Sequence, residues 1–471
     1  MKTYLLEEIL KATGAKMIIG GETKKFSRIS IDSRDCRGGE IFFAIKGEKF
    51  DGNDFVLKAL ENGALGAVVS ETNKIVRDLP LEGSVTILET RDTLTALQDL
   101  AAFYREKVNP KVIAITGSNG KTTTKEILHS ILSKKASAIK TIGNFNNLIG
   151  LPLSLLNVDY GCRFAVIEMG MSVKGEIDRL CQVAMPSDAI LTNVALSHSE
   201  NFSDITEIAE EKALLARYVE EKKGKVLCNG DDKVLVQAVK KVCRNPILFG
   251  KGEECHIRMY DLENDLRGVS FSYKGLGKKG RIRLNLPGIH NAYNCLGAIA
   301  YSILEGFTEN EIEKGVESAE TLSGRMSVKE LPCGITIIDD SYNANPNSFE
   351  KAIEYLSCLE CRGRRIVLMG DMLELGKYTE SSHRSIGKLC AQKGMDFLFT
   401  VGRESRLAAN EAVRAGIPEK NVLSFDDAST AGEALSRLLN RDDILLVKGS
   451  RMMRLERAIE VLLRKIEEGS E

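Results

Sequence analysis

The chain has 471 residues, more than one hydrophobic core usually holds, and about 150 residues per domain gives an expectation of three domains. Hydrophobic residues make up 43% and charged residues 28%, which excludes a disordered protein. The net charge of −1 excludes overall attraction to nucleic acid or to an anionic membrane. The 11 cysteines are scattered without a repeating framework, which indicates reduced thiols. No signal-peptide core and no long apolar run is found, so we expect a cytoplasmic protein.

Residues 1–84 combine short strand-like runs with turns and with one helical stretch, FVLKALENGA. The segment DTLTALQDLAAFYREKV, residues 92–108, has apolar residues at the three- and four-residue spacing of a helix. A boundary just before this helix makes residues 1–84 a smaller N-terminal α/β domain.

The central part of the chain, residues 85–316, follows a strand, loop and helix order. The run KVIAIT predicts a strand, and TTTKEILHSILSKK predicts a helix after a glycine-containing loop. Further apolar runs, FAVIEMG, DAILTNV and KVLCNGDD, alternate with helical stretches. This rhythm is typical of a parallel sheet with helices on both faces.

The last part, residues 317–471, restarts the same pattern. The runs RRIVLMGDM and DDILLVKGS read as strands that are separated by helices. We therefore predict a second α/β unit here, and an α/β protein of three domains overall.

The loop Gly117-Ser118-Asn119-Gly120-Lys121-Thr122 resembles the nucleotide-binding motif G-x-x-x-x-G-K-[ST], although Ile115 stands where its first glycine would fall. A strand before the loop and a helix after it are the context that the motif requires, because the helix N-terminus favours a phosphate. Lys121 would hold β- and γ-phosphate oxygens, and the Thr122 hydroxyl would bind Mg²⁺. Thr123 follows at the start of the helix.

Three further residues could serve a metal ion. Glu168 follows an apolar strand, at the edge where open α/β sheets bind ligands, although a solvent-facing strand end is the simpler alternative. His198 also follows a strand, but most such histidines are structural. Lys212 taken alone reads as a solvated lysine on an acidic helix.

Polar residues also cluster at two later positions. His290, Asn291 and Asn294 precede or begin an apolar helix, where they could cap it or could read an adenine edge. In the last part, Arg325 precedes a strand, and IIDDSYNANPNS places many donors and acceptors at a strand's carboxyl end. That density indicates a binding loop rather than a simple turn.

Taken together, these motifs resemble the Mur ligase family over nearly the whole chain. The motifs that carry the resemblance are IDSRDCRGGEIFFAIKG with FDGNDF, AITGSNGKTTTKEI, GNFNNLIGLPLSLL, FAVIEMGMS, TNVALSHSENF with Lys212, LPGIHNAYN, SGRM, DDSYNANPNS, MGDMLELG and VKGSRMM. The resemblance implies an N-terminal domain that binds the UDP part of the substrate, a central ATPase domain and a Rossmann-like C-terminal domain. It implies an ATP-dependent ligase of cytoplasmic peptidoglycan precursor synthesis, and we expect a monomer.

The resemblance also implies roles for individual residues. Ser33 and Arg34 would lie at the uridine end of the substrate, and Asn144, Asn146 and Asn147 would meet its sugar-phosphate side. His290, Asn291 and Asn294 would face adenine, while Arg325 and Asp340 would reach the ATP phosphates and ribose. Asn343 and Asn345 would lie near an incoming D-alanyl-D-alanine.

In the family the lysine that matches Lys212 is carbamylated by CO₂. An unmodified lysine is a cation and cannot bind Mg²⁺, whereas a carbamate presents anionic oxygens. The resemblance thus implies that Lys212 joins Glu168 and His198 at the second of two Mg²⁺ sites.

The family has several amino-acid-adding members, and two features bear on which one this chain resembles. The motif D-N-P-R, expected of the member that adds a dibasic residue, is absent, which favours the dipeptide-adding member. Asn53 stands where relatives commonly have histidine. The alternatives left open are another amino-acid-adding Mur ligase, a folylpolyglutamate-type synthetase and, from a different class, a nucleotide-dependent switch protein.

Overall fold

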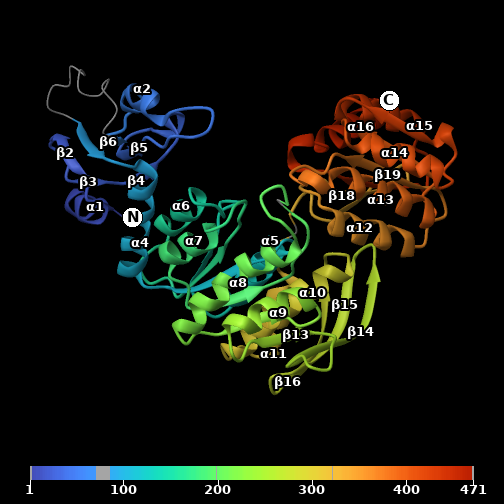
Figure 1. Ribbon diagram of the computed structural model, residues 1–471, viewed down its shortest axis with the longest axis horizontal. Helices are drawn as coiled ribbons and strands as arrows, with labels where there is room; N and C mark the ends of the chain where they lie inside the picture. Colours follow the sequence, from blue (N-terminus) through green and yellow to red (C-terminus); the bar gives the residue numbers. More distant parts are fainter. Residues whose placement is uncertain (1–2, 71–84, 198, 321, 469–471) are drawn as a thin grey trace. The chain divides into compact units, whose positions relative to one another are not determined.

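The computed structural model describes residues 3–70, 85–197, 199–320 and 322–468, and it is a mixed α/β structure with several parallel sheets (Figure 1). The chain divides into two compact units. The first unit is Met1–Ala114, Ala136–Met171 and Gly175–Asp188, and the second is Ile115–Lys135, Ser172–Lys174 and Ala189–Glu471. The domain boundaries predicted at 84/85 and 316/317 do not coincide with this division and stay predictions.

The first unit begins with a five-stranded sheet of order β2-β7-β6-β5-β4, in which only β2 is antiparallel to its neighbour. The same part of the chain also forms a separate two-stranded antiparallel sheet from β1 and β3. The strands are β1 (Tyr4–Leu5), β2 (Lys16–Ile19), β3 (Lys25–Phe26), β4 (Arg28–Ser30), β5 (Glu40–Phe43), β6 (Gly66–Ser70) and β7 (Thr86–Thr90). The helices are α1 (Leu6–Thr13), α2 (Val56–Glu61) and α4 (Thr93–Val108). The predicted helices FVLKALENGA and 92–108 are thereby confirmed.

The rest of the first unit surrounds helix α4. Strands β9 (Ala138–Lys140) and β10 (Phe164–Glu168) pair in parallel, and helices α6 (Gly150–Leu156) and α7 (Glu176–Ala184) contact α4. The Arg105 guanidinium on α4 donates hydrogen bonds to the carbonyls of Ala184 and Met185, each at 2.9 Å. These bonds satisfy the free carbonyls at the end of α7.

The division between the units falls within β8 (Lys111–Thr116), the strand that leads into the glycine loop. In the second unit β11 (Asp188–Leu191), β12 (Val226–Asn229), β13 (Ile247–Gly250) and β14 (Ile257–Asp265) pair in parallel, and β15 (Gly268–Gly275) and β16 (Lys278–Leu284) continue antiparallel. The helices are α5 (Lys121–Leu132), α8 (Ile205–Glu221), α9 (Lys233–Val242), α10 (Ile289–Leu304) and α11 (Glu309–Glu317). Helix α10 packs on α5 and on β12 and β13, which places its first turn beside the loop.

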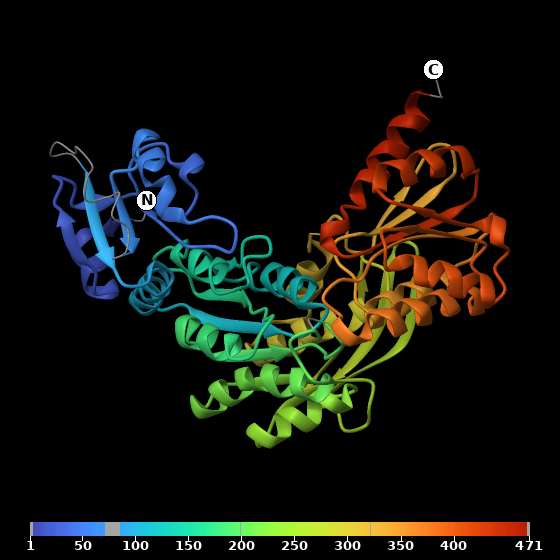
Figure 2. The ribbon, with the colours of Figure 1, turned by 45° about the horizontal axis from the view of Figure 1, so that its top comes forward.

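Residues 322–468 carry a six-stranded sheet of order β17-β18-β22-β19-β20-β21, parallel except for β17. Its strands are β17 (Ser327–Glu330), β18 (Thr336–Asp340), β19 (Arg365–Gly370), β20 (Phe397–Val401), β21 (Val422–Phe425) and β22 (Ile444–Lys448). Its helices are α12 (Pro346–Cys358), α13 (Thr379–Gln392), α14 (Ser405–Arg414), α15 (Ala428–Leu438) and α16 (Glu456–Glu468). Figure 2 shows the strands of this segment, in orange to red, between two layers of helices.

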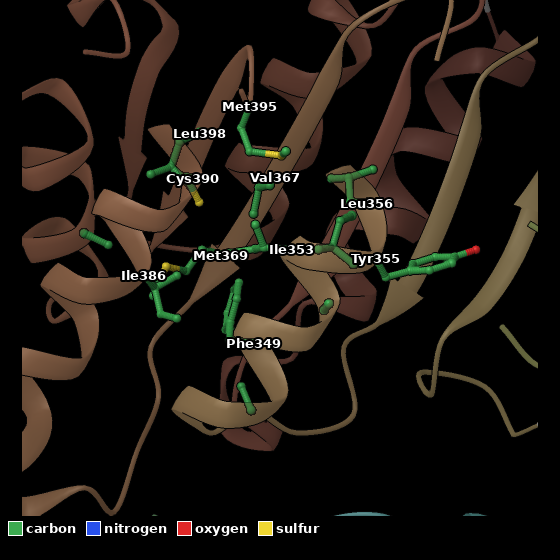
Figure 3. Close-up of a cluster of buried hydrophobic side chains, with 14 of the residues drawn as sticks. Phe349, Ile353, Tyr355, Leu356, Val367, Met369, Ile386, Cys390, Met395 and Leu398 are labelled. Atoms are coloured by element: carbon green, nitrogen blue, oxygen red, sulfur yellow. The ribbon is translucent and has the colours of Figure 1, made fainter. Parts of the chain in front are cut away.

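Two apolar cores cover the two faces of this sheet. Phe349 and Ile353 of α12 and Ile386 of α13 pack with Val367 and Met369 on one face (Figure 3). On the other face, the neighbouring residues of β19, Ile366 and Leu368, pack with α15 and α16. Successive side chains of a strand point to opposite faces, so a sheet covered on both sides needs the unbroken apolar runs of the sequence.

Among the described residues, the helices are all too short or too polar to span a membrane. The 11 cysteines are free thiols.

Candidate active site

The glycine loop joins β8 to α5, and the backbone at two of its residues strongly favours glycine. Gly117 has φ +152° and Gly120 has φ +82°, a region that side chains disfavour. An added Cβ at Gly117 would lie 1.9 Å from Thr192 Oγ1, and one at Gly120 would lie 2.1 Å from Asn294 Oδ1. The loop therefore fits closely against the end of β11 and the first turns of α10.

Two residues that the sequence analysis did not select hold the loop in shape. Asn193 Oδ1 accepts a hydrogen bond from Asn119 N at 2.9 Å, and its Nδ2 donates to Asn119 O at the same distance. Thr192 Oγ1 also donates to Asn119 O, at 2.6 Å. Both residues follow β11 in the run DAILTNV. A polar pair directly after a buried strand is the sequence feature from which their role could have been predicted.

The loop has the features of an anion site at the start of α5. Gly120 is the residue before the helix, so the first N–H groups of α5 point towards the loop. Lys121 Nζ donates to Gly117 O at 2.8 Å and so lies over the loop. Thr122 is buried in the first turn, and Thr123 beside it is half-buried. Backbone donors, a helix N-terminus and an ammonium group together suit a phosphate chain.

Lys212 is buried in α8, only 3% exposed, which contradicts the interpretation of this residue alone as a solvated lysine. Burial lowers the pKa of Lys212 well below its usual value, and the positive charge of Lys121 lowers it further, against the opposing charge of Glu211. Of the residues that the structure describes, none forms an ion pair with its ammonium group. A buried amine of lowered pKa is available in its neutral, nucleophilic form.

Glu168 ends β10 in the first unit and is 2% exposed, so it is not a solvent-facing strand end. Its Oε1 accepts a hydrogen bond from Asn146 Nδ2 at 2.8 Å. The Asn146 carbonyl also accepts a hydrogen bond from Gly170 N, at 2.8 Å. Asn147 Oδ1 accepts from Gly150 N at 2.8 Å at the start of α6, and Asn144 precedes this turn with its side chain exposed.

His198 lies outside the described residues. Within the described ranges no group of three His, Cys, Asp or Glu side chains is arranged to hold a metal ion. The Mg²⁺ sites predicted from Thr122, Glu168, His198 and Lys212 therefore stay predictions.

The first two turns of α10 carry the three residues predicted to face adenine. Asn291 Nδ2 donates to Pro287 O at 2.7 Å, and Asn294 Nδ2 donates to Asn291 Oδ1 at 3.1 Å. This chain of amides fixes Asn294 against Gly120 of the loop. Burial lowers the pKa of His290 to about 3, and the charges of Lys351 and Lys448 act in the same direction. His290 is therefore a neutral donor or acceptor near pH 7.

Arg325 and Asp340 belong to the last α/β part. The Arg325 guanidinium lies 4.1 Å from the ring centroid of Tyr342, a cation–π contact. Asp340 forms an ion pair with Lys448 at 2.5 Å, and its Oδ1 accepts from Met326 N at 3.2 Å. Lys448, which the sequence analysis did not select, also donates to Asn343 O at 3.0 Å. The sequence feature that could have identified it is a lysine at the end of the apolar run in DDILLVKGS.

The SYNANP segment, residues 341–346, follows β18 and contacts the glycine loop. Asn345 Nδ2 donates to Asn119 Oδ1 at 2.8 Å, and Asn119 Nδ2 lies 3.4 Å from Asn345 Oδ1. Asn343 Oδ1 accepts from Ala344 N at 2.9 Å. The structure thus brings together the nucleotide loop, the first turn of α10 and this segment.

Ser33 and Arg34 lie in a short 3₁₀ helix between β4 and β5, and Asn53 lies in another just before α2, all in the first unit. Ser33 is buried, and Asn62 Nδ2 donates to its carbonyl at 2.8 Å. Arg34 is exposed and forms an ion pair with Asp32 at 2.6 Å. Asn53 Nδ2 donates to Asp51 Oδ1 at 2.6 Å, and its Oδ1 accepts from Ser70 N at 3.2 Å. The amide that replaces the common histidine therefore uses both of its ends within the domain.

A phosphate-binding loop between a buried strand and a helix, set in an α/β architecture, defines a P-loop nucleotide-binding protein. Three family models match the chain: "Mur ligase family, catalytic domain" over residues 25–105, "Mur ligase middle domain" over 115–302, and "Mur ligase, glutamate ligase domain" over 324–451. The chain belongs to the Mur ligase family, as the sequence motifs predicted.

Relatives and solved structures cover nearly the whole chain. The UDP-N-acetylmuramoyl-tripeptide--D-alanyl-D-alanine ligase of Bacillus subtilis is 33% identical over 92% of this chain and 93% of its own length. The ligase of the same name from Haemophilus influenzae is 32% identical over 99% of each chain. A crystal structure of MurF from Acinetobacter baumannii aligns with a TM-score of 0.87 at 29% identity, covering 98% of this chain and 99% of that one. MurF ligase from Thermotoga maritima in complex with ADP gives a TM-score of 0.81 at 29% identity, covering 94% of this chain and 98% of that one.

Proposed function

We propose that this chain joins D-alanyl-D-alanine to UDP-N-acetylmuramoyl-tripeptide with consumption of ATP, in the cytoplasmic synthesis of peptidoglycan precursors. The observation that carries the proposal is the similarity, over 92% to 99% of the chain, to relatives that bear this name. The absence of D-N-P-R and the presence of the SYNANP segment favour the same member of the family. We further propose that the protein works as a monomer on these small-molecule substrates.

The reaction first needs an electrophile at the terminal carboxylate of the tripeptide. A carboxylate oxygen attacks the ATP γ-phosphorus in line, the bond from γ-phosphorus to the β,γ-bridging oxygen breaks, and an acyl phosphate and ADP form. Two anions must approach each other in this step. Lys121 and the N–H groups at the start of α5 offset the charge of the phosphates, and Arg325 adds a second cation.

The amide bond forms in the second step. The neutral amine of the dipeptide attacks the acyl carbonyl, the tetrahedral intermediate loses inorganic phosphate, and the amine gives up its proton. Asn343 is the proposed acceptor-side residue, because the SYNANP segment lies against the glycine loop through Asn345. Lys448 orients the backbone of this segment through the Asn343 carbonyl, at 3.0 Å.

Two Mg²⁺ ions and a carbamate on Lys212 complete the proposal. Mg²⁺ would offset the phosphate charges, and hard oxygen ligands suit it. The donor set fits: Thr122 offers a hydroxyl and Glu168 a buried carboxylate. At Lys212 the neutral amine would add to CO₂ and release one proton, so that an anionic carbamate replaces the buried amine. His198 would be the remaining ligand.

The first test is phosphate release from ATP and Mg²⁺ with the UDP-linked tripeptide alone, with D-alanyl-D-alanine alone, and with both. We expect release only with both substrates, and mass spectrometry should find a product heavier by one dipeptide less one water. Release that ignores both substrates would favour a nucleotide-dependent switch instead. A product formed with a single amino acid, and none with the dipeptide, would indicate another member of the family.

A further inference from the structure

The Asn119 side chain of the nucleotide loop faces the SYNANP segment, and its backbone has no freedom to turn away. Its N–H donates to Asn193 Oδ1 at 2.9 Å, and its carbonyl accepts from Thr192 Oγ1 at 2.6 Å and from Asn193 Nδ2 at 2.9 Å. A loop residue pinned at both backbone groups presents its side chain in one direction. That direction is fixed by the same loop that would hold the ATP phosphates.

Asn345 is held equally firmly from the other side. It is the N-cap of α12, and its Oδ1 accepts from Ser348 N at 2.9 Å while Ser348 Oγ accepts from Asn345 N at 3.0 Å. This reciprocal capping box fixes both the backbone and the side chain. Asn345 is only 6% exposed, so its amide is not a surface group that could rotate freely.

The two amides meet across 226 positions of sequence. Asn345 Nδ2 donates to Asn119 Oδ1 at 2.8 Å, with the return contact at 3.4 Å. Only a side chain that carries a donor and an acceptor can take part in such a two-way contact. Since Asn345 Oδ1 also caps α12, little of this amide is left to bind a substrate.

We infer that Asn119 and Asn345 form a positioning pair that couples nucleotide binding to the placement of the acceptor segment. A nucleotide that orders the glycine loop favours the arrangement in which the pair forms, and this arrangement sets the start of α12 and the neighbouring Asn343. The coupling is reciprocal, because a ligand that favours one arrangement tightens the binding of any other ligand that favours it. Asn345 thereby acts through Asn119 rather than on the dipeptide. The effect of the pair on the placement of D-alanyl-D-alanine rests on the proposed function, whereas its effect on nucleotide binding does not.

The test is a double-mutant cycle with Asn119→Ala, Asn345→Ser and the double variant, in the full chain. Serine is also a good N-cap but is too short to reach Asn119, so Asn345→Ser removes the pair and keeps the cap. Asp427→Ser is the matched control, because Asp427 caps α15 through Thr430 N at 3.0 Å with no contact to the loop. Thermal unfolding without ligand reports whether each variant is folded. If Asn345→Ser fails to fold, Asn345→Thr takes its place, since threonine also caps helices, is too short to reach Asn119 and adds no charge.

Two readouts decide the outcome. Calorimetry with a non-hydrolysable ATP analogue should show about three- to tenfold weaker binding for each single variant, with the double variant no weaker than the singles. The KM for D-alanyl-D-alanine should rise by a similar factor, with kcat changed less, and Asp427→Ser should match the wild type. Additive losses in the double variant, or unchanged analogue binding in Asn345→Ser, would overturn the pair. If wild-type protein makes no dipeptide product, the proposed function fails, and the analogue cycle still decides the pair.

Discussion

The ammonium group of Lys212 lies on the buried side of α8, where a charge is poorly solvated. A buried ammonium group that has no ion pair among the described residues is costly, which favours the neutral amine, and carbamylation converts this amine to an anion that positive charge nearby can stabilise. The positive charge of Lys121 acts on Lys212 and lowers its pKa. The physical argument for the modification therefore starts from burial, which is a property of this chain, and the family resemblance supplies the chemistry.

Lys212→Ala should lower ligase activity by at least about 100-fold, because a group that organises charge in the site is lost. Bicarbonate should not restore activity, whereas a short carboxylic acid should restore part of it by filling the vacated anion position. The steady-state rate with and without added acetate measures this. Lys222→Ala, at the exposed end of the same helix, is the control and should retain activity. Full activity in Lys212→Ala would exclude the carbamate.

Gly120→Ala should weaken nucleotide binding by more than about tenfold, because the new Cβ would lie 2.1 Å from Asn294 Oδ1 and push the loop out of shape. Gly277→Ala separates backbone strain from crowding, since Gly277 has a similar φ of +77° with nothing within 4 Å. The control should lower Tm modestly and leave nucleotide affinity unchanged. Equal nucleotide affinity in the two variants would show that the space beside Asn294 is not required.

At the scale of elements, one histidine helps to hold the segment between β19 and α13. His383 Nε2 accepts from Met372 N at 3.0 Å, and its Nδ1 lies 2.7 Å from Thr379 O, so the ring is neutral with its proton on Nδ1. The segment then contacts the chain after β11. Ser199 Oγ donates to Leu375 O at 3.2 Å and Tyr378 OH donates to Ser203 O at 3.3 Å. A change in the ring's protonation would therefore disturb a contact between distant parts of the second unit.

Burial lowers the pKa of His383, so the folded state binds a proton less readily than the unfolded state does. The stability that this neutral ring contributes is complete above the unfolded pKa of about 6.5 and is lost as the pH falls through the lower, folded value. His383→Gln keeps a donor and an acceptor and cannot titrate. The Tm difference between wild type and this variant should thus shrink between pH 7 and pH 5. Parallel Tm curves over that range would contradict the assignment.

At the scale of the whole molecule, the α/β class, the glycine loop and the main strands could be predicted because each leaves a local pattern. The run RRIVLMGDM predicted a buried strand, and Ile366 and Val367 do face opposite cores. Lys212 could not be placed from its acidic neighbours, because its burial comes from the packing of α8. The contact between Asn119 and Asn345 has no local signal, since it joins residues 226 positions apart. Which element faces which is set by tertiary packing, and spacing along the chain carries no record of it.

The arrangement of cores also predicts how the chain can be divided. A fragment of residues 322–468 should fold alone, because its own helices cover both faces of its sheet. A fragment of residues 189–468 should gain no further folded part, because it lacks α5, on which α10 and α11 pack. Circular dichroism with thermal unfolding should show one cooperative transition in each fragment, at a similar temperature.

Phe349→Ala tests whether that transition belongs to the core in Figure 3, where Phe349 is completely buried. Its loss from a packed core should cost about 3–5 kcal/mol and abolish or strongly lower the transition in both fragments. A second, higher transition in the longer fragment would show that α10 and α11 fold without α5. The inference that α10 and α11 need α5 to complete their core would then be wrong.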